Sequence, residues 1–114
     1  MLEQFFLIAL VVQLVHSVEE LATGFHRRWY LFKMSFRTFL AFEILFSAFW
    51  IFVFFSASLP YREYLQAFFL ILMFANGVQH LVWWGSEKRY VPGLMTAFVH
   101  LVVFLVFYFT MLFS

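Results

Sequence analysis

Four apolar stretches, each about twenty residues long, constrain this chain more than any other feature. They cover approximately residues 2–23, 38–58, 64–85 and 92–113. A hydrocarbon core of about 30 Å requires about 20 helical residues to cross it. Because unpaired backbone groups are costly in lipid, such segments cross as helices. The sequence therefore predicts an all-α integral membrane protein with four transmembrane helices.

The composition indicates that most of the surface faces lipid. Of 114 residues, 66% are hydrophobic and 11% are charged, and 20 are phenylalanine. A water-soluble domain this small would need more polar surface than the chain has. A net charge of +1 gives no clustered basic face for nucleic acid, and the absence of cysteine excludes thiolate metal sites. We expect one domain over residues 1–114, with the lipid bilayer as its main partner.

The breaks between the stretches are polar and short. Gly24, Pro60 and Gly85 lie in or beside them, and Pro92 fits the first turn of the fourth helix. Short connections favour an antiparallel, up-down-up-down bundle.

The basic residues predict the orientation of the bundle. Four lie in residues 24–37 and two in residues 86–91, six in all, whereas the middle loop contains Arg62 alone. The positive-inside rule places the two basic loops in the cytoplasm and both termini on the other side. We expect the membrane to be the plasma (inner) membrane of a prokaryote.

Polar side chains within all four spans fall at one depth. Because the helices alternate in direction, the second halves of the first and third spans meet the first halves of the second and fourth. The residues concerned are Gln13, His16, Glu19 and Glu20 in the first span, Glu43 in the second, Asn76, Gln79 and His80 in the third, and Gly93, Thr96 and His100 in the fourth. This coincidence predicts an inward-facing His/Glu cluster in the cytoplasmic half of the membrane.

Glutamates inside a membrane require a partner. A charged side chain at the centre of a span costs about 2.5–3.5 kcal/mol on translocon scales. The three glutamates must therefore be paired, protonated or bound to a metal, and no lysine or arginine lies beside them in the spans. Carboxylates with imidazoles suit zinc, iron or manganese.

Three short motifs resemble those of a known family. His16-Ser17-Val18-Glu19-Glu20 resembles the H-x-x-E-E signature of the HXXEE family of small membrane proteins. An N-x-x-x-H motif over residues 76–80 and a P-G-x-x-T motif over residues 92–96 follow in order. The resemblance covers nearly the whole chain and implies that its motif residues form the site, but it implies no particular reaction. Those residues are His16, Glu19, Glu20, Asn76, His80, Pro92, Gly93 and Thr96.

The cluster favours a metal-dependent enzyme that hydrolyses a lipid-borne group. The expected metal ligands are His16, Glu19, Glu20, Glu43, His80 and His100, with His100 alternatively a hydrogen-bond partner of a glutamate. Glu19 is alternatively the general base. Asn76 and Thr96 are expected to orient the ligands or contact substrate.

Two other functions fit the same residues. Glu/His chains in membranes also occur in proton and metal-ion pathways, and transport through so small a chain would require a homo-oligomer. A structural or partner-binding protein could instead use histidine–carboxylate hydrogen bonds to join its helices. Ion flux in liposomes would identify the first alternative, and a folded protein without metal would favour the second.

Overall fold

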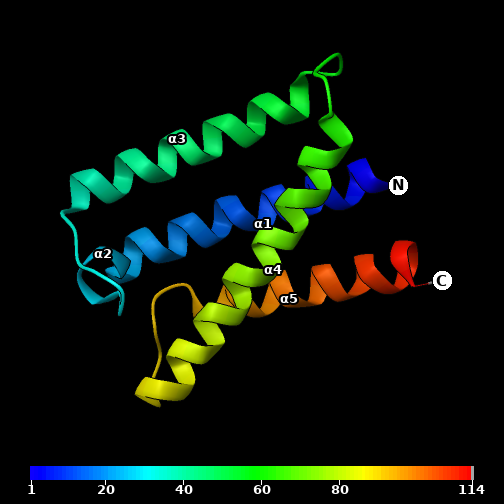
Figure 1. The fold of residues 1–114 in the computed structure, drawn as a ribbon. Coiled ribbons are helices and arrows are strands. Elements are labelled where there is room, and N and C mark those ends of the chain that lie inside the picture. Colours follow the sequence, from blue (N-terminus) through cyan, green and yellow to red (C-terminus); the bar gives the residue numbers. More distant parts are fainter. Residues whose placement is uncertain (114) are drawn as a thin grey trace.

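Four long helices make up this all-α protein, as the computed structural model of residues 1–113 shows (Figure 1). Each is long and apolar enough to cross a membrane, which confirms the predicted all-α fold with four helices that could span one. Their direction across the membrane remains a prediction. The helices are α1 (Leu2–Thr23), α3 (Phe36–Phe55), α4 (Arg62–Glu87) and α5 (Leu94–Phe107), with a single turn α2 (Phe25–Arg28) after α1 and a π-helical segment η1 (Tyr108–Leu112) after α5.

Local chemistry explains where the helices end. α1 stops at Gly24, whose φ of 82° is left-handed and whose N–H donates to the Glu20 carbonyl. α3 begins two residues earlier than predicted because the Ser35 hydroxyl accepts the Thr38 N–H at 3.1 Å. α4 extends two residues beyond its predicted range at each end.

Arg62 fastens the turn between α3 and α4. Its guanidinium donates to the carbonyls of Val53 and Phe54 at 3.1 and 2.7 Å, and to the Glu3 carboxylate at 2.7 Å. These carbonyls belong to the last turn of α3, where no helical donor remains for them. The side chain therefore closes α3 earlier than residue 58, its predicted end.

Pro92 lies in a turn before α5, not in the first turn of the helix as predicted. Gly93 adopts a φ of 88°, and helical geometry begins at Leu94. The Leu94 N–H donates to the Val91 carbonyl at 3.1 Å, which closes the turn.

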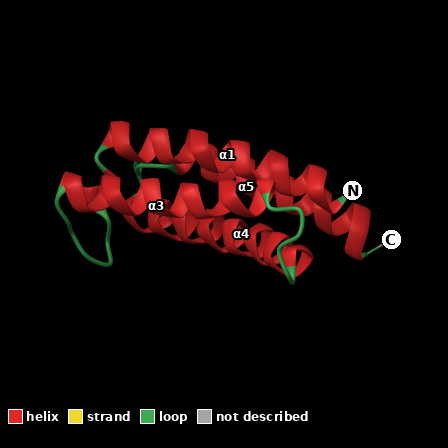
Figure 2. Ribbon diagram, turned by 90° about the horizontal axis from the view of Figure 1, so that it is seen from above, coloured by secondary structure: helices red, strands yellow, loops and turns green. Residues whose placement is uncertain are grey.

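The helices run alternately in opposite directions, and α4 is inclined across α1 and α5 (Figure 1). Seen from above, α1 and α4 lie on opposite sides of the molecule (Figure 2). α4 packs most extensively on α5 and also on α1, whereas it has little contact with α3. We call the end where α1 and α4 finish and α3 and α5 begin the cluster end.

Two aromatic clusters enclose a polar layer. The cluster that includes Phe6, Trp50 and Phe69 fills the far half of the bundle, and a second that includes Phe25 and Trp83 fills the cluster end. Between them lie the buried polar side chains of Gln13, His16, Ser17, Glu20, Glu43, His80 and His100.

Candidate metal centre

A buried group of three side chains from two helices could hold a metal ion. His16 and Glu20 lie one turn apart on α1, so both project toward α4, where His80 meets them. The Glu20 Oε2 atom lies 3.3 Å from His16 Nε2 and 3.1 Å from His80 Nε2. One potential ligand atom from each residue lies within 4.8 Å of the others. The three residues are 0%, 4% and 0% exposed, so the group is shielded from solvent.

The group fits a cation better than it fits a hydrogen-bond network. Nδ1 of His80 has no hydrogen-bond partner within residues 1–113, and Nε2 meets the Glu20 carboxylate at 3.1 Å as an ion-pair contact, not as a well-aligned hydrogen bond. Among the same residues, no lysine or arginine forms an ion pair with Glu20. Buried polar groups normally have hydrogen-bond partners, and buried charges are paired or bind metals. Two imidazoles and one carboxylate are a common ligand set for catalytic zinc and for non-haem iron.

Thr96 determines which ring nitrogen of His16 carries the proton. The Thr96 hydroxyl donates its one proton to Glu19 Oε1 at 2.6 Å. Its oxygen, 2.6 Å from His16 Nδ1, must then accept a proton from that nitrogen. His16 therefore carries its proton on Nδ1 and turns the lone pair of Nε2 toward Glu20, as a metal ligand requires.

Glu19 caps the N-terminus of α5 instead of joining the group of three. Its carboxylate accepts the backbone N–H groups of Met95 and Thr96 at 3.1 and 2.9 Å and a hydrogen bond from the Tyr90 hydroxyl. These backbone donors have no partner within the helix, and the helix dipole favours a negative charge there. Partial burial, followed by the bond to Glu19, raises the pKa of Tyr90, so the phenol is the donor at neutral pH.

Gly93 lets the α5 turn approach the group closely. A Cβ atom at this position would lie 2.7 Å from His80 Cε1, 2.8 Å from His16 Cε1 and 3.0 Å from Glu20 Cγ. Its φ of 88° also favours glycine. Both its conformation and its surroundings therefore exclude a side chain.

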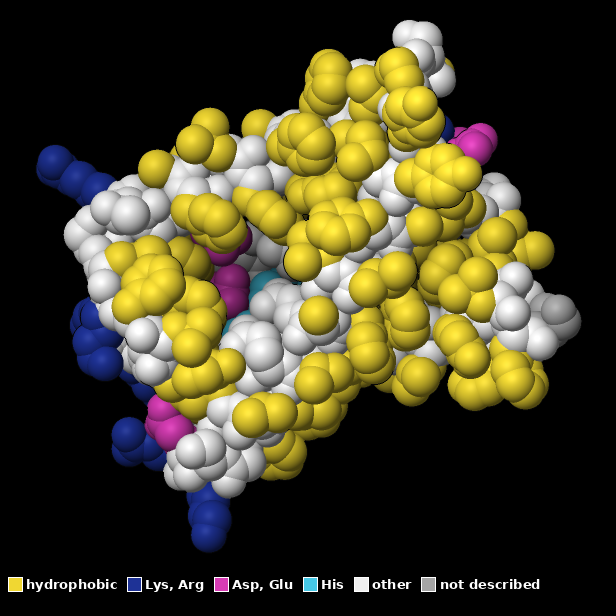
Figure 3. Space-filling model, in the orientation of Figure 1, with side chains coloured by type: hydrophobic (Ala, Val, Ile, Leu, Met, Phe, Trp, Pro, Cys, Tyr) yellow, Lys and Arg dark blue, Asp and Glu magenta, His cyan; other side chains and the backbone are white. Residues whose placement is uncertain are grey.

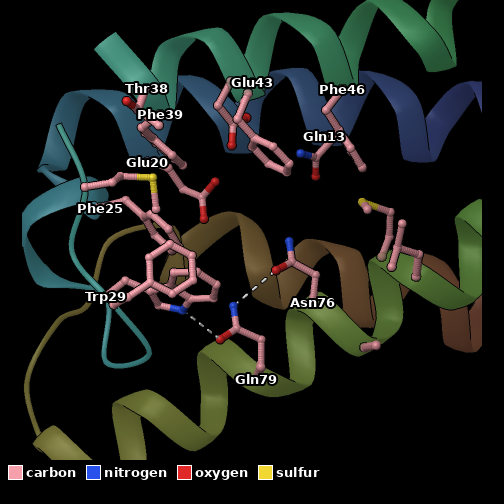
Figure 4. Close-up of a pocket in the computed structure, with 16 residues that line it drawn as sticks. Gln13, Glu20, Phe25, Trp29, Thr38, Phe39, Glu43, Phe46, Asn76 and Gln79 are labelled. Carbon is pink, nitrogen blue, oxygen red and sulfur yellow. Dashed lines mark hydrogen bonds between the residues drawn. The ribbon is translucent and has the colours of Figure 1, made fainter. Parts of the chain in front are cut away.

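A series of side-chain hydrogen bonds runs from Trp29 through Gln79 and Asn76 to His16. Trp29 Nε1 donates to the Gln79 side chain at 3.4 Å, and Gln79 Nε2 donates to Asn76 at 3.1 Å (Figure 4). Asn76 Nδ2 lies 3.1 Å from His16 Nε2, whose lone pair accepts. This series holds the Asn76 amide beside the group of three.

Glu43 takes part in a second series of buried hydrogen bonds. The Ser17 hydroxyl donates to Glu43, and Gln13 Nε2 donates to Ser17 at 3.3 Å. The Gln13 oxygen accepts from His100 Nε2 at 3.1 Å. Glu43 is thus held on α3 next to the group of three without being one of its members.

A cavity of about 560 Å³ adjoins the carboxylates of Glu20 and Glu43. Glutamate and histidine side chains are visible at the bottom of a hollow that hydrophobic side chains surround (Figure 3). Glu20 and Glu43 border it from above and Asn76 and Gln79 from α4 (Figure 4). Most of the remaining lining is apolar and comes from Phe25, Trp29, Phe32, Met34, Phe39, Phe42, Phe46, Leu72, Met73 and Ala75.

Comparison with known proteins identifies the family. A family model described as a protein of unknown function with an HXXEE motif matches residues 7–109. The chain belongs to this HXXEE family. No curated protein and no solved structure matches the chain.

The geometry gives each part of the HXXEE motif its own task. His16 and Glu20 are in the candidate metal group, and Glu19, rotated by about 100° from Glu20, faces α5 instead. The other two motifs converge on the same place. Asn76 and His80 approach from α4, while Gly93 and Thr96 approach from the start of α5.

The structure sorts the predicted site residues into three settings. His16, Glu20 and His80 come together as one group. Glu43 and Asn76 lie beside that group on the cavity. Glu19 and His100 make hydrogen bonds outside the group, His100 to Gln13, while Thr96 joins Glu19 to the His16 ring.

Sequence reasoning missed the parts played by Ser17 and Tyr90, which bond the carboxylates of Glu43 and Glu19. The position of Ser17, one turn after Gln13 on the same face, was an available signal. From the sequence, Tyr90 is expected to be an aromatic residue at the membrane interface, and nothing in the sequence links it to Glu19.

Proposed function

We propose that this HXXEE protein is an intramembrane metal-dependent hydrolase of a lipid-borne group. The observation that carries the proposal is the buried group of His16, Glu20 and His80 at the edge of a largely apolar cavity. The three side chains would hold one divalent ion, with zinc, iron and manganese all suited to the ligand set. When bound, the ion supplies Lewis acidity, which polarises a carbonyl and lowers the pKa of a water molecule.

Glu43 is the candidate general base. It is 5% exposed, borders the cavity and is oriented by Ser17. For an ester, the oxygen of water bonds to the carbonyl carbon while Glu43 accepts the proton. The bond to the leaving oxygen then breaks, that oxygen takes up the proton, and the products are a carboxylic acid and an alcohol.

Asn76 is placed to contact the substrate. A cation on His16 Nε2 would replace the hydrogen bond from Asn76 Nδ2, which is 3.1 Å long. The freed amide would remain beside the reacting group, held by Gln79. It could then donate to the oxygen on which negative charge develops.

The packing favours an enzyme over a transporter. The buried rings of Phe6, Trp50, Phe69 and Phe107 fill the far half of the bundle, so apolar side chains separate the polar layer from that end. Gln66, 1% exposed, is buried in that half, and a single amide cannot carry ions through it. The unpartnered Nδ1 of His80, and the poorly aligned contact of its Nε2 with Glu20, also argue against a network that serves only to join helices.

Hydrolysis can be tested with defined lipids. The purified protein would be loaded with each of the three metals and mixed with vesicles of phosphatidylglycerol and phosphatidylethanolamine, and the lipids would be analysed by mass spectrometry. We expect fatty acid to be released with at least one metal and release to stop on chelation and in Glu20→Gln. A folded, metal-loaded protein that cleaves no acyl ester or phosphate ester bond of these lipids would contradict the assignment.

A further inference from the structure

The cavity beside the metal group extends along α3 by a length close to the thickness of one membrane leaflet. Thr38 and Phe46 both line it and lie eight residues apart on α3. At 1.5 Å per residue this separation is about 12 Å. One leaflet contributes about 15 Å of hydrocarbon. The cavity therefore runs from the interfacial end of α3 almost to the middle of the bilayer.

The polar lining residues lie between two apolar parts of the cavity. Phe25 and Trp29 line it toward the cluster end, beside Thr38, and Phe46 and Leu72 line it toward the middle of the bundle. Glu20 and the other reactive groups lie between these two ends. Gln13 also borders the inner part, but both ends of its amide are bonded to Ser17 and His100.

The cavity opens sideways, between α3 and α4. These two helices have little contact with each other, although each packs on α1. Phe42, a lining residue on α3 with an exposed fraction of 55%, lies at the opening. Apolar side chains exposed within the spans face hydrocarbon, so the opening leads into lipid and not into water. The volume is within the usual range of about 300–1,000 Å³ for ligand pockets.

We infer that one acyl chain of a bilayer lipid enters between α3 and α4 and occupies this cavity, with its ester next to Glu20 and Glu43. The inference rests on the proposed function, since it makes that ester the group hydrolysed. Phe39, Phe46, Leu72 and Met73 hold the chain, and the carbonyl lies at the depth of Asn76. Substrate selection then depends on chain width and on the depth of the ester, and not on a soluble headgroup.

Photochemical labelling tests this site directly. The protein would be reconstituted in phosphatidylcholine vesicles containing a fraction of lipid with a diazirine on its acyl chain, irradiated, and analysed by peptide mass spectrometry. Phe39 and Met73 are 2% and 3% exposed, so lipid outside the bundle does not reach them. We expect adducts on both, in addition to adducts on outward-facing residues such as Val99 and Val102.

A matched pair of variants gives the specificity of the labelling. Ala75→Trp places an indole in the opening and should remove the adducts on Phe39 and Met73. Ala48→Trp is the control. Ala48 is exposed like Ala75 and does not line the cavity. It lies twelve residues after the start of α3, and Ala75 lies twelve residues before the end of α4. Labelling of Val99 must stay unchanged in both variants.

The outcomes separate this inference from the proposed function when metal content is measured on the same samples. Wild-type protein that holds metal but is labelled only on outward-facing residues would overturn the acyl-chain site alone. Protein–protein cross-links through the opening in place of lipid adducts would also overturn it, in favour of a second copy of the chain. Adducts on Phe39 in a protein that holds no metal would support the lipid site and contradict the metalloenzyme.

Discussion

The Nδ1 atom of His16 lies 2.6 Å from the hydroxyl oxygen of Thr96. Because that hydroxyl donates to Glu19, the capping carboxylate of Glu19 orients the imidazole of His16, one turn earlier on the same helix. The start of α5 and the candidate metal group are thereby one hydrogen-bonded unit. Residues that do not touch the ion should consequently affect how tightly it binds.

Thr96→Val should lower metal affinity while the protein stays folded. The substitution keeps the shape of the side chain but removes the hydroxyl that accepts from His16. Loss of such an orienting partner typically costs about 10–100-fold in metal affinity. Titration against a chromophoric chelator measures the change, and Thr96→Ser should restore most of the affinity. Equal affinity in Thr96→Val and wild type would show that His16 needs no orienting partner.

Gly93→Ala and Gly85→Ala should change stability in opposite directions. At position 93, the left-handed backbone alone costs a residue with a Cβ about 1–2 kcal/mol, and the new atom meets both histidine rings. At position 85, on α4, a Cβ meets nothing within 4 Å, so alanine should stabilise by about 0.5–1 kcal/mol.

Thermal unfolding in detergent, followed by circular dichroism, measures both effects. Metal binding should be lost in Gly93→Ala only. A Gly93→Ala protein with wild-type stability and metal content would mean that the α5 turn does not pack on the metal group as described.

Glu43→Gln should separate metal binding from catalysis. Glu43 is outside the group of three, so the variant should retain its ion. The amide accepts no proton from water, and loss of a general base typically costs about 10²–10⁴-fold in rate. Metal content and lipid turnover measured on one preparation decide the point. A variant with normal turnover would require another base.

The direction of the chain in the membrane can be tested with single cysteines, because the native chain has none. The excess of basic residues at the cluster end predicts that this end is cytoplasmic. A membrane-impermeant maleimide should label Ser58→Cys on intact cells and Ser86→Cys only after permeabilisation. The reverse pattern would place the metal group in the other leaflet.

The sequence predicted the four helices because length and hydropathy alone decide whether a segment can cross a membrane. It also predicted that His16, Glu20 and His80 share a depth, since depth follows from position along alternating helices. Both predictions depend on distances along single helices, which have a fixed rise per residue.

The sequence did not predict which neighbouring helix each side chain faces. Glu19 and Glu20 are adjacent, and hydropathy does not tell which of them faces α4 and which faces α5. The answer depends on the tilt of α4, which packing against α1 and α5 sets. The same tilt separates α4 from α3 and creates the cavity, so the cavity was not predictable either.

Metal content of the purified protein tests the central claim most directly. Elemental mass spectrometry would be applied to protein prepared in mild detergent without chelator, from cells grown with added zinc, iron and manganese. We expect about one ion per chain in wild type and its loss from His16→Ala, Glu20→Ala and His80→Ala, each still folded. His26→Ala, a histidine at the same end of the bundle but outside the group, should keep the ion. No bound metal in wild type, or equal metal in all four variants, would contradict a metal centre formed by His16, Glu20 and His80.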